Sequence, residues 1–160
     1  MKIDDSILLA RDFDIFFLHE VCGKFRPVHC ATFGSLLPED LNDDDYIAYC
    51  AGEVAASPIF LPEQEIEIMT DNVNHILGLN TQEDLMNNEE RRGAYIRTFV
   101  NMARKGFWSY DRYHHPHSEP NREEDRFILI SYPKLKGDFY PRLRVCNCMT
   151  LIDDYKAIVK

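Results

Sequence analysis

The amino-acid sequence predicts a single α+β domain built on an antiparallel sheet. Strand-like segments lie near both ends of the 160-residue chain, and helix-like segments lie between them. Strands and helices grouped in this way, rather than alternating, are typical of α+β folds. The length fits one domain, and neither a repeat nor a low-complexity tract divides the chain. We therefore expect one domain over residues 1–160, in which an N-terminal hairpin and three C-terminal strands pack against about three to four helices.

The N-terminal hairpin is predicted from two segments with strand composition. Residues 14–19 and 25–33 are rich in aromatic and β-branched side chains, and Gly23 lies in the short link between them. Glycine adopts the positive φ that a tight hairpin turn requires. Pro27 cannot donate a ladder hydrogen bond, so we expect an edge position or a bulge in the second arm.

Helices are predicted in the middle of the chain. Acidic residues at 39–45 precede an apolar pattern over residues 46–54, as expected at a helix N-terminus, where carboxylates interact favourably with the dipole. A second helix is indicated around residues 73–77. The clearest pattern covers residues 89–105, whose apolar positions recur with a period near 3.6 and end before Gly106.

The C-terminal part is predicted to add three strands and a last helix. Residues 107–110 and 126–132 are aromatic and β-branched, and residues 143–149 alternate between apolar and polar side chains. The spacing of the apolar residues in 151–159 favours a helix.

Composition excludes two broad classes of protein. Apolar residues make up 45% of the chain and aromatic residues 12%, which is enough to form a core and argues against disorder. The longest apolar runs are far shorter than the ~20 residues of a membrane-spanning helix. Acidic residues near Met1 do not resemble an export signal, and the five cysteines are an odd number. These features predict a soluble, cytoplasmic protein with reduced thiols and no membrane association.

Charge is distributed unevenly along the chain. Its formal net charge is −9, but residues 1–90 contain 19 acids and 4 bases, whereas residues 91–160 contain 8 acids and 14 bases. A strongly acidic surface attracts basic partners and speeds their encounter. We therefore expect a non-enzymatic interaction protein, an inhibitor or immunity-type factor that binds a basic protein partner and uses no cofactor. The predicted binding residues are Glu39, Asp40, Asp43, Asp44 and Asp45, joined by Tyr46 and Tyr49 where their rings face outward.

A metal-dependent enzyme is the first alternative. His114, His115 and His117 are close in sequence, and imidazole binds zinc, copper or nickel. Cys146 and Cys148, two residues apart on a predicted strand, point their sulfurs to the same face and would complete a mixed site. The spacings of recognised zinc motifs are absent, so the primary expectation is that no metal binds.

A single-stranded nucleic-acid binder is the second alternative. Residues 104–112 interleave Arg and Lys with aromatic side chains, including Trp108, which suits phosphate neutralisation and base stacking. The overall negative charge of the chain disfavours nucleic acid as a partner. Cys30 beside His29 is the nearest approach to a catalytic pair, but adjacent strand residues point to opposite faces, so we interpret both as structural.

Overall fold

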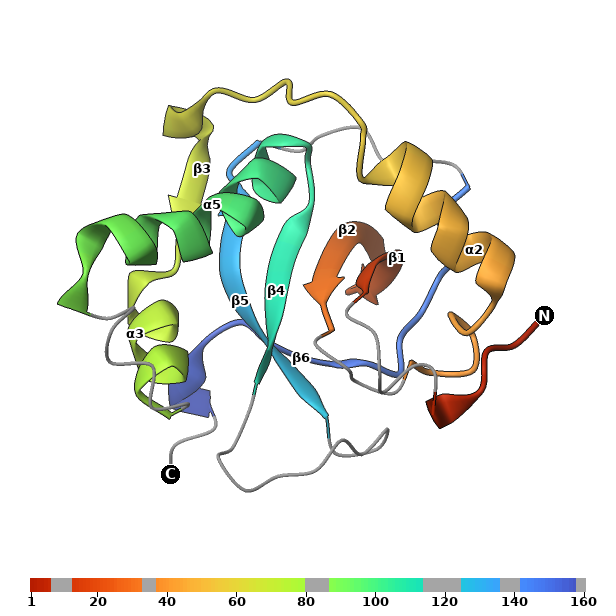
Figure 1. Cartoon of the computed structure of the whole chain (residues 1–160). Coiled ribbons are helices and arrows are strands. Elements are labelled where there is room, and N and C mark those ends of the chain that lie inside the picture. Colours follow the sequence, from red (N-terminus) through yellow and green to blue (C-terminus); the bar gives the residue numbers. More distant parts are fainter. Residues whose placement is uncertain (7–12, 33–36, 80–86, 114–124, 136–141, 158–160) are drawn as a thin grey trace.

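One mixed sheet organises the chain. The computed structural model describes residues 1–6, 13–32, 37–79, 87–113, 125–135 and 142–157. The sheet has six strands in the order β1-β2-β4-β5-β3, and β6 also pairs with β5 (Figure 1). The predicted α+β class is confirmed, but the expected antiparallel sheet is not.

The N-terminal hairpin forms as predicted. β1 (Asp14–Val21) and β2 (Lys24–Ala31) pair antiparallel with Val21 opposite Lys24, so the turn consists of Cys22 and Gly23. Their φ angles are 51° and 80°. Positive φ at both central residues matches the type I′ turn, whose twist suits a hairpin.

Two strand pairings are parallel, which corrects the predicted sheet. β2 pairs in parallel with β4 (Trp108–Tyr113), and β4 pairs antiparallel with β5 (Arg126–Pro133). β5 then pairs antiparallel with β3 (Ile66–Ile68) and in parallel with β6 (Thr150–Ile152). The connection from β2 to β4 contains helices at residues 44–49, 70–79 and 89–104, and a long crossover of this kind is what a parallel pair requires.

The end of the chain also differs from the prediction. Residues 143–149 form no regular strand; they contribute a single parallel bridge between Val145 and Leu18. The Leu18 N–H donates to the Arg144 carbonyl at 2.8 Å, and the Cys146 N–H donates to the Leu18 carbonyl at 2.9 Å. This segment therefore covers the free edge of β1, which would otherwise expose unpaired backbone groups.

The predicted last helix is wrong within the described residues. β6 occupies its start, and only the short 3₁₀ turn η3 (Tyr155–Ala157) follows. Leu151 and Ile152 pair with Phe127 and Ile128 of β5 instead of forming a helical stripe.

The helices agree better with their predictions. α2 (Asp44–Tyr49) continues into the π-helical turn η1 (Cys50–Val54), and α3 (Thr70–Leu79) follows the short 3₁₀ turn η2 (Glu63–Glu65) and β3. α5 (Glu89–Arg104) ends before Gly106, whose φ is 99°. No helix in these described segments is long and apolar enough to cross a membrane.

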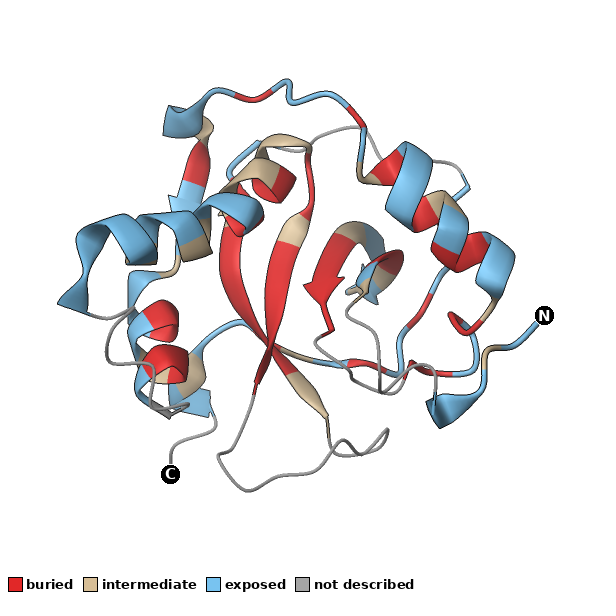
Figure 2. Cartoon of the chain, in the orientation of Figure 1, coloured by how far each residue is buried: buried red, intermediate tan, exposed pale blue. Residues whose placement is uncertain are grey.

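The two larger clusters of the core lie on opposite faces of the sheet, because Phe127 and Leu129 of β5 belong to one and Ile128 and Ile130 belong to the other. α3 and α5 pack on β4 and β5 through a cluster that includes Ile76, Phe99 and Ile130. α2 and η1 pack beside β1, together with buried residues of the C-terminal segment such as Met149. Figure 2 shows buried strands between helices whose outer faces are exposed. In this arrangement the start of α2 lies at the surface, apart from α3 and α5 (Figure 1).

Candidate functional site

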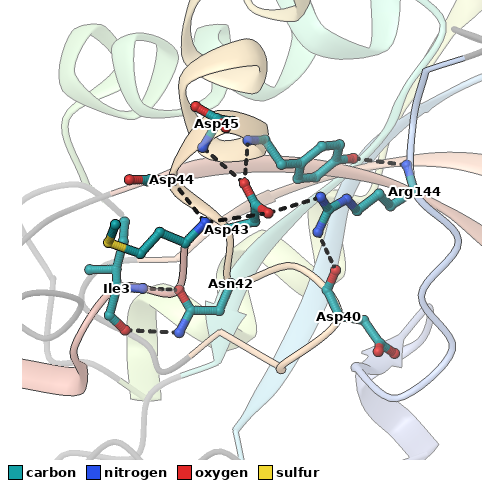
Figure 3. A network of polar contacts seen from close by, with 9 residues as sticks. Ile3, Asp40, Asn42, Asp43, Asp44, Asp45 and Arg144 are labelled. Atoms are coloured by element: carbon teal, nitrogen blue, oxygen red, sulfur yellow. Dashed lines mark hydrogen bonds and ion pairs between the residues drawn. The ribbon is translucent and has the colours of Figure 1, made fainter.

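The predicted acidic residues do gather around the start of α2. Asp43 is the N-cap: its Oδ1 accepts from the backbone N–H of Asp45 at 2.9 Å and of Tyr46 at 3.2 Å (Figure 3). These hydrogen bonds satisfy backbone donors that the first helical turn leaves open. Asp43 Oδ2 lies 3.2 Å from the Arg144 guanidinium and 3.8 Å from the N-terminal ammonium of Met1. The Tyr46 backbone N–H, followed by Arg144, lowers the pKa of Asp43. Asp43 therefore holds α2 to the C-terminal segment.

The other four acids differ in how far they are engaged. Glu39 pairs with Lys2, and Asp44 lies 3.3 Å from the Met1 ammonium. Asp40 and Asp45 are exposed, and within the described part of the chain no hydrogen bond or ion pair involves their carboxylates. Arg144 does reach Asp40, but it donates to the backbone carbonyl at 3.1 Å (Figure 3). Both side chains are exposed, and the Asp40 carboxylate also lies near the sulfurs of Cys146 and Cys148.

The aromatic residues of the predicted surface are less available. Tyr46 is only 6% exposed, donates its hydroxyl hydrogen to the Phe16 carbonyl and accepts from the Arg144 N–H at 3.1 Å. The Tyr46 ring therefore does not face outward, which was the condition for counting Tyr46 among the predicted binding residues. Tyr49 is half-buried, with the Arg142 guanidinium 4.2 Å from its ring centroid. A partner would meet Arg142 before the Tyr49 ring.

Bases from the C-terminal half pair with acids from the N-terminal half. The pairs and their N–O distances are Arg144–Asp43 at 3.2 Å, Arg142–Glu53 at 3.4 Å, Lys134–Glu67 at 3.6 Å and Arg104–Glu63 at 3.9 Å. The charge asymmetry of the sequence is therefore partly neutralised in space. Exposed acids remain at the start of α2, where Asp40 and Asp45 lie, and at other places such as Asp71 and Glu90.

One part of the predicted mixed metal site comes together. His114, His115 and His117 lie outside the described residues. The sulfurs of Cys146 and Cys148 are 3.5 Å apart, and a carboxylate oxygen of Asp40 lies within 4.8 Å of both. Cys148 is exposed and Cys146 is buried, and burial raises the pKa of the Cys146 thiol to about 12. All five cysteines of the chain are free thiols.

Trp108 does not offer the stacking surface that nucleic-acid binding would use. The Arg26 guanidinium lies 3.7 Å from its ring centroid, and the Tyr132 ring stacks on it at 4.5 Å. Arg26 and Tyr132 belong to β2 and β5, the strands on either side of β4, and both contact the indole ring. A base would have to displace one of them. A cleft of about 370 Å³ beside Trp108 is lined by Phe25 and Leu135 among others.

A chain of three polar residues crosses the sheet at the end of the hairpin. His29 Nε2 lies 2.8 Å from Asp14 Oδ1, and His29 Nδ1 lies 2.7 Å from Ser109 Oγ. These residue types form the catalytic triad of serine hydrolases. Here the aspartate, and not the serine, is the exposed member: Ser109 is fully buried, whereas the Asp14 side chain is 43% exposed. The Ser109 hydroxyl therefore cannot reach a substrate. The hydrogen bonds from Ser109 through His29 instead orient the Asp14 side chain.

A partly buried hydrogen-bonded pair, Tyr95 and Asp111, lies next to these three residues. Tyr95 of α5 donates its hydroxyl hydrogen to Asp111, and burial raises the pKa of Asp111 to about 7. Asp14 and Tyr95 also line a cavity of about 290 Å³ between α5 and the ends of β1 and β2. Sequence reasoning missed this group. Asp111 directly follows the predicted strand 107–110, whereas β4 continues to Tyr113, so the sequence did not indicate that its side chain is buried.

Comparison of the chain with protein-family models, with curated proteins and with solved structures gave no match.

Proposed function

We propose that the protein is a non-enzymatic interaction factor whose acidic surface at the start of α2 binds a basic protein partner. The observation that supports this is the position of Asp40 and Asp45, whose exposed carboxylates are engaged by no described residue. Glu39 and Asp44 flank them, with side chains that are 76% and 50% exposed. An inhibitor or immunity-type factor that blocks a basic enzyme is the role that suits this surface.

The acids of this surface have different roles, structural for Asp43 and electrostatic for Asp40 and Asp45. Asp43 maintains the helix start and the contact with Arg144, so its replacement would disturb the fold as well as the binding. Asp40 and Asp45 provide the electrostatic attraction. Exposed charges of this kind mainly change the association rate and its salt dependence.

The test is a kinetic comparison with the partner recovered from the native cell. Affinity purification and mass spectrometry identify the partner, and association is then measured with purified proteins over a range of salt. We expect the D40N/D45N double variant to associate at least about threefold more slowly at low ionic strength, with a flatter salt dependence and an unchanged dissociation rate.

A charge-matched control separates a local effect from a general loss of negative charge. Asp71 and Glu90 are exposed acids in the first turns of α3 and α5, away from α2 (Figure 1). The D71N/E90Q variant loses the same charge and should associate as the wild type does. Equal slowing in both double variants, or in neither, would contradict the proposed surface.

A further inference from the structure

Two thiols and one carboxylate meet between the start of α2 and the C-terminal segment. Asp40 lies in the turn before α2, where the Leu41 N–H donates to the Pro38 carbonyl at 3.0 Å. Cys146 and Cys148 lie on the segment that covers the edge of β1. Residues distant in sequence thus present three potential ligand atoms within 4.8 Å of one another.

Backbone contacts hold this cluster together from both sides. The Cys146 N–H donates to the Leu18 carbonyl at 2.9 Å, which fixes the C-terminal segment on β1. The Arg144 guanidinium donates to the Asp40 carbonyl at 3.1 Å, which fixes the turn to the same segment. The positions of the three residues therefore follow from the fold, and a ligand would find them already assembled.

The distances suit a tetrahedral metal ion. Zinc binds thiolate sulfur at about 2.3 Å, so two sulfurs on one tetrahedral ion are about 3.8 Å apart. The sulfurs of Cys146 and Cys148 are 3.5 Å apart, within a few tenths of an ångström of that separation. A carboxylate oxygen binds zinc at about 2.0–2.2 Å, and the exposed Asp40 side chain can move the short distance needed.

We propose that Asp40, Cys146 and Cys148 bind one thiophilic divalent cation, of which Zn²⁺ is the best match. Both sulfurs bind as thiolates, so their protons pass to solvent, and no oxidation or reduction takes place. Three protein ligands leave the fourth position to water, because Cys148 is exposed and opens the site to solvent. This inference goes beyond partner binding and does not depend on it.

The test uses the full chain, purified without a tag under a phosphine reductant and freed of metal. Co²⁺ is the probe, because thiolate ligation to Co²⁺ gives a charge-transfer absorption band, and Zn²⁺ is then added as competitor. We expect one Co²⁺ per chain, displaced by one Zn²⁺. Cys148→Ser should weaken binding at least about tenfold, and Asp40→Asn by less.

Two control variants make the result specific. Cys22, at the hairpin turn, is an exposed free thiol outside the cluster, so Cys22→Ser should bind Co²⁺ as the wild type does. Asp45→Asn should also leave metal binding unchanged. Cys148 is the deciding position because its side chain is exposed, and circular dichroism verifies that the variant folds; Cys146→Ser replaces a buried thiol and is secondary.

Several outcomes would overturn the site. These are the absence of a charge-transfer band, unchanged Co²⁺ binding in Cys148→Ser, an equal loss in Cys22→Ser, or a Cys146–Cys148 disulfide that persists under the reductant. Failure here is distinguishable from failure of the proposed function. Cys148→Ser changes no carboxylate of the acidic surface, and Asp45→Asn changes no metal ligand. Because Asp40 belongs to both, partner association of Asp40 variants is measured on metal-free protein.

Discussion

Asp111 brings a carboxyl group into the core between α5 and the sheet. It is 5% exposed, its Oδ2 accepts from the Tyr95 hydroxyl and its Oδ1 accepts from the Arg112 backbone N–H at 2.9 Å. Burial raises its pKa to about 7, although both hydrogen bonds favour the charged form. A buried carboxylate is costly unless its partners replace the lost hydration.

The raised pKa predicts that stability falls as the pH rises toward neutrality. Between the reference pKa of 3.8 and the native pKa of about 7, the folded protein holds a proton that the unfolded chain has lost. Asp111 therefore lowers the free energy of unfolding with increasing pH across this interval, by at most about 1.4 kcal/mol per pH unit for one proton. Above pH 7 its contribution levels off.

Asp111→Asn removes this titration and allows it to be measured. We expect urea unfolding to show that the variant gains stability relative to the wild type between pH 5 and pH 8. Asn87→Ala, a change at an exposed position that removes no titratable group, should run parallel to the wild type over the same range. A difference between Asp111→Asn and the wild type that stays constant with pH would contradict the prediction.

At the scale of the element, α5 was predictable because its signals are local. Asn88 caps it, Glu89 and Glu90 lie in its first turn, Arg104 lies in its last turn, and Gly106 follows with positive φ. Its buried residues include Phe99 and Met102, which belong to the apolar stripe visible in the sequence. Every one of these features lies within a few turns of helix.

The N-cap of α5 should contribute measurably to the stability of the protein. Asn88 accepts from the Arg91 N–H at 3.1 Å. Asn88→Ala should lower the free energy of unfolding by about 1 kcal/mol, because one backbone donor loses its partner. Asn88→Asp should retain most of the stability, and Asn87→Ala, at the exposed neighbouring position, should change little. Urea denaturation of the three variants gives the comparison; equal effects at both positions would refute the cap.

β6 and the parallel pairings were not predictable from the same kind of reasoning. The spacing of Leu151, Ile152 and Tyr155 suits one side of a helix, yet Leu151 and Ile152 complete the edge of β5. Likewise, no local sequence feature of β2 or β4 indicates that the two strands pair in parallel. Contacts between residues far apart in sequence determine these strand pairings, and they override the local preference for secondary structure.

At the scale of the whole molecule, the candidate site was only partly predictable for the same reason. The acids at the start of α2 are contiguous, so the sequence indicated them, including the helix start that Asp43 caps. The pairing of Arg144 with Asp43, and the meeting of Asp40 with Cys148, depend on the C-terminal segment reaching β1. Asp14, His29 and Ser109 are brought together by strand pairing across three strands.

The C-terminal segment should therefore be an integral part of one cooperative unit. Met149 is 8% exposed and packs in the cluster that joins β1, α2 and the sheet, whereas Val145 of the same segment is 46% exposed. Met149→Ala should lower the free energy of unfolding by about 2–5 kcal/mol, because it leaves a cavity in the core. Val145→Ala should change it by less than about 0.5 kcal/mol.

Cooperativity is measured by comparing two probes of the same urea transition. Trp108 is the single tryptophan of the chain and lies on β4, so its fluorescence reports on the sheet, while far-UV circular dichroism reports on all the helices and strands. If the segment is part of one unit, Met149→Ala shifts both transitions together to lower urea. A circular-dichroism change that precedes the fluorescence change would mean that some helices or strands unfold before the sheet around Trp108, which would contradict a single cooperative unit.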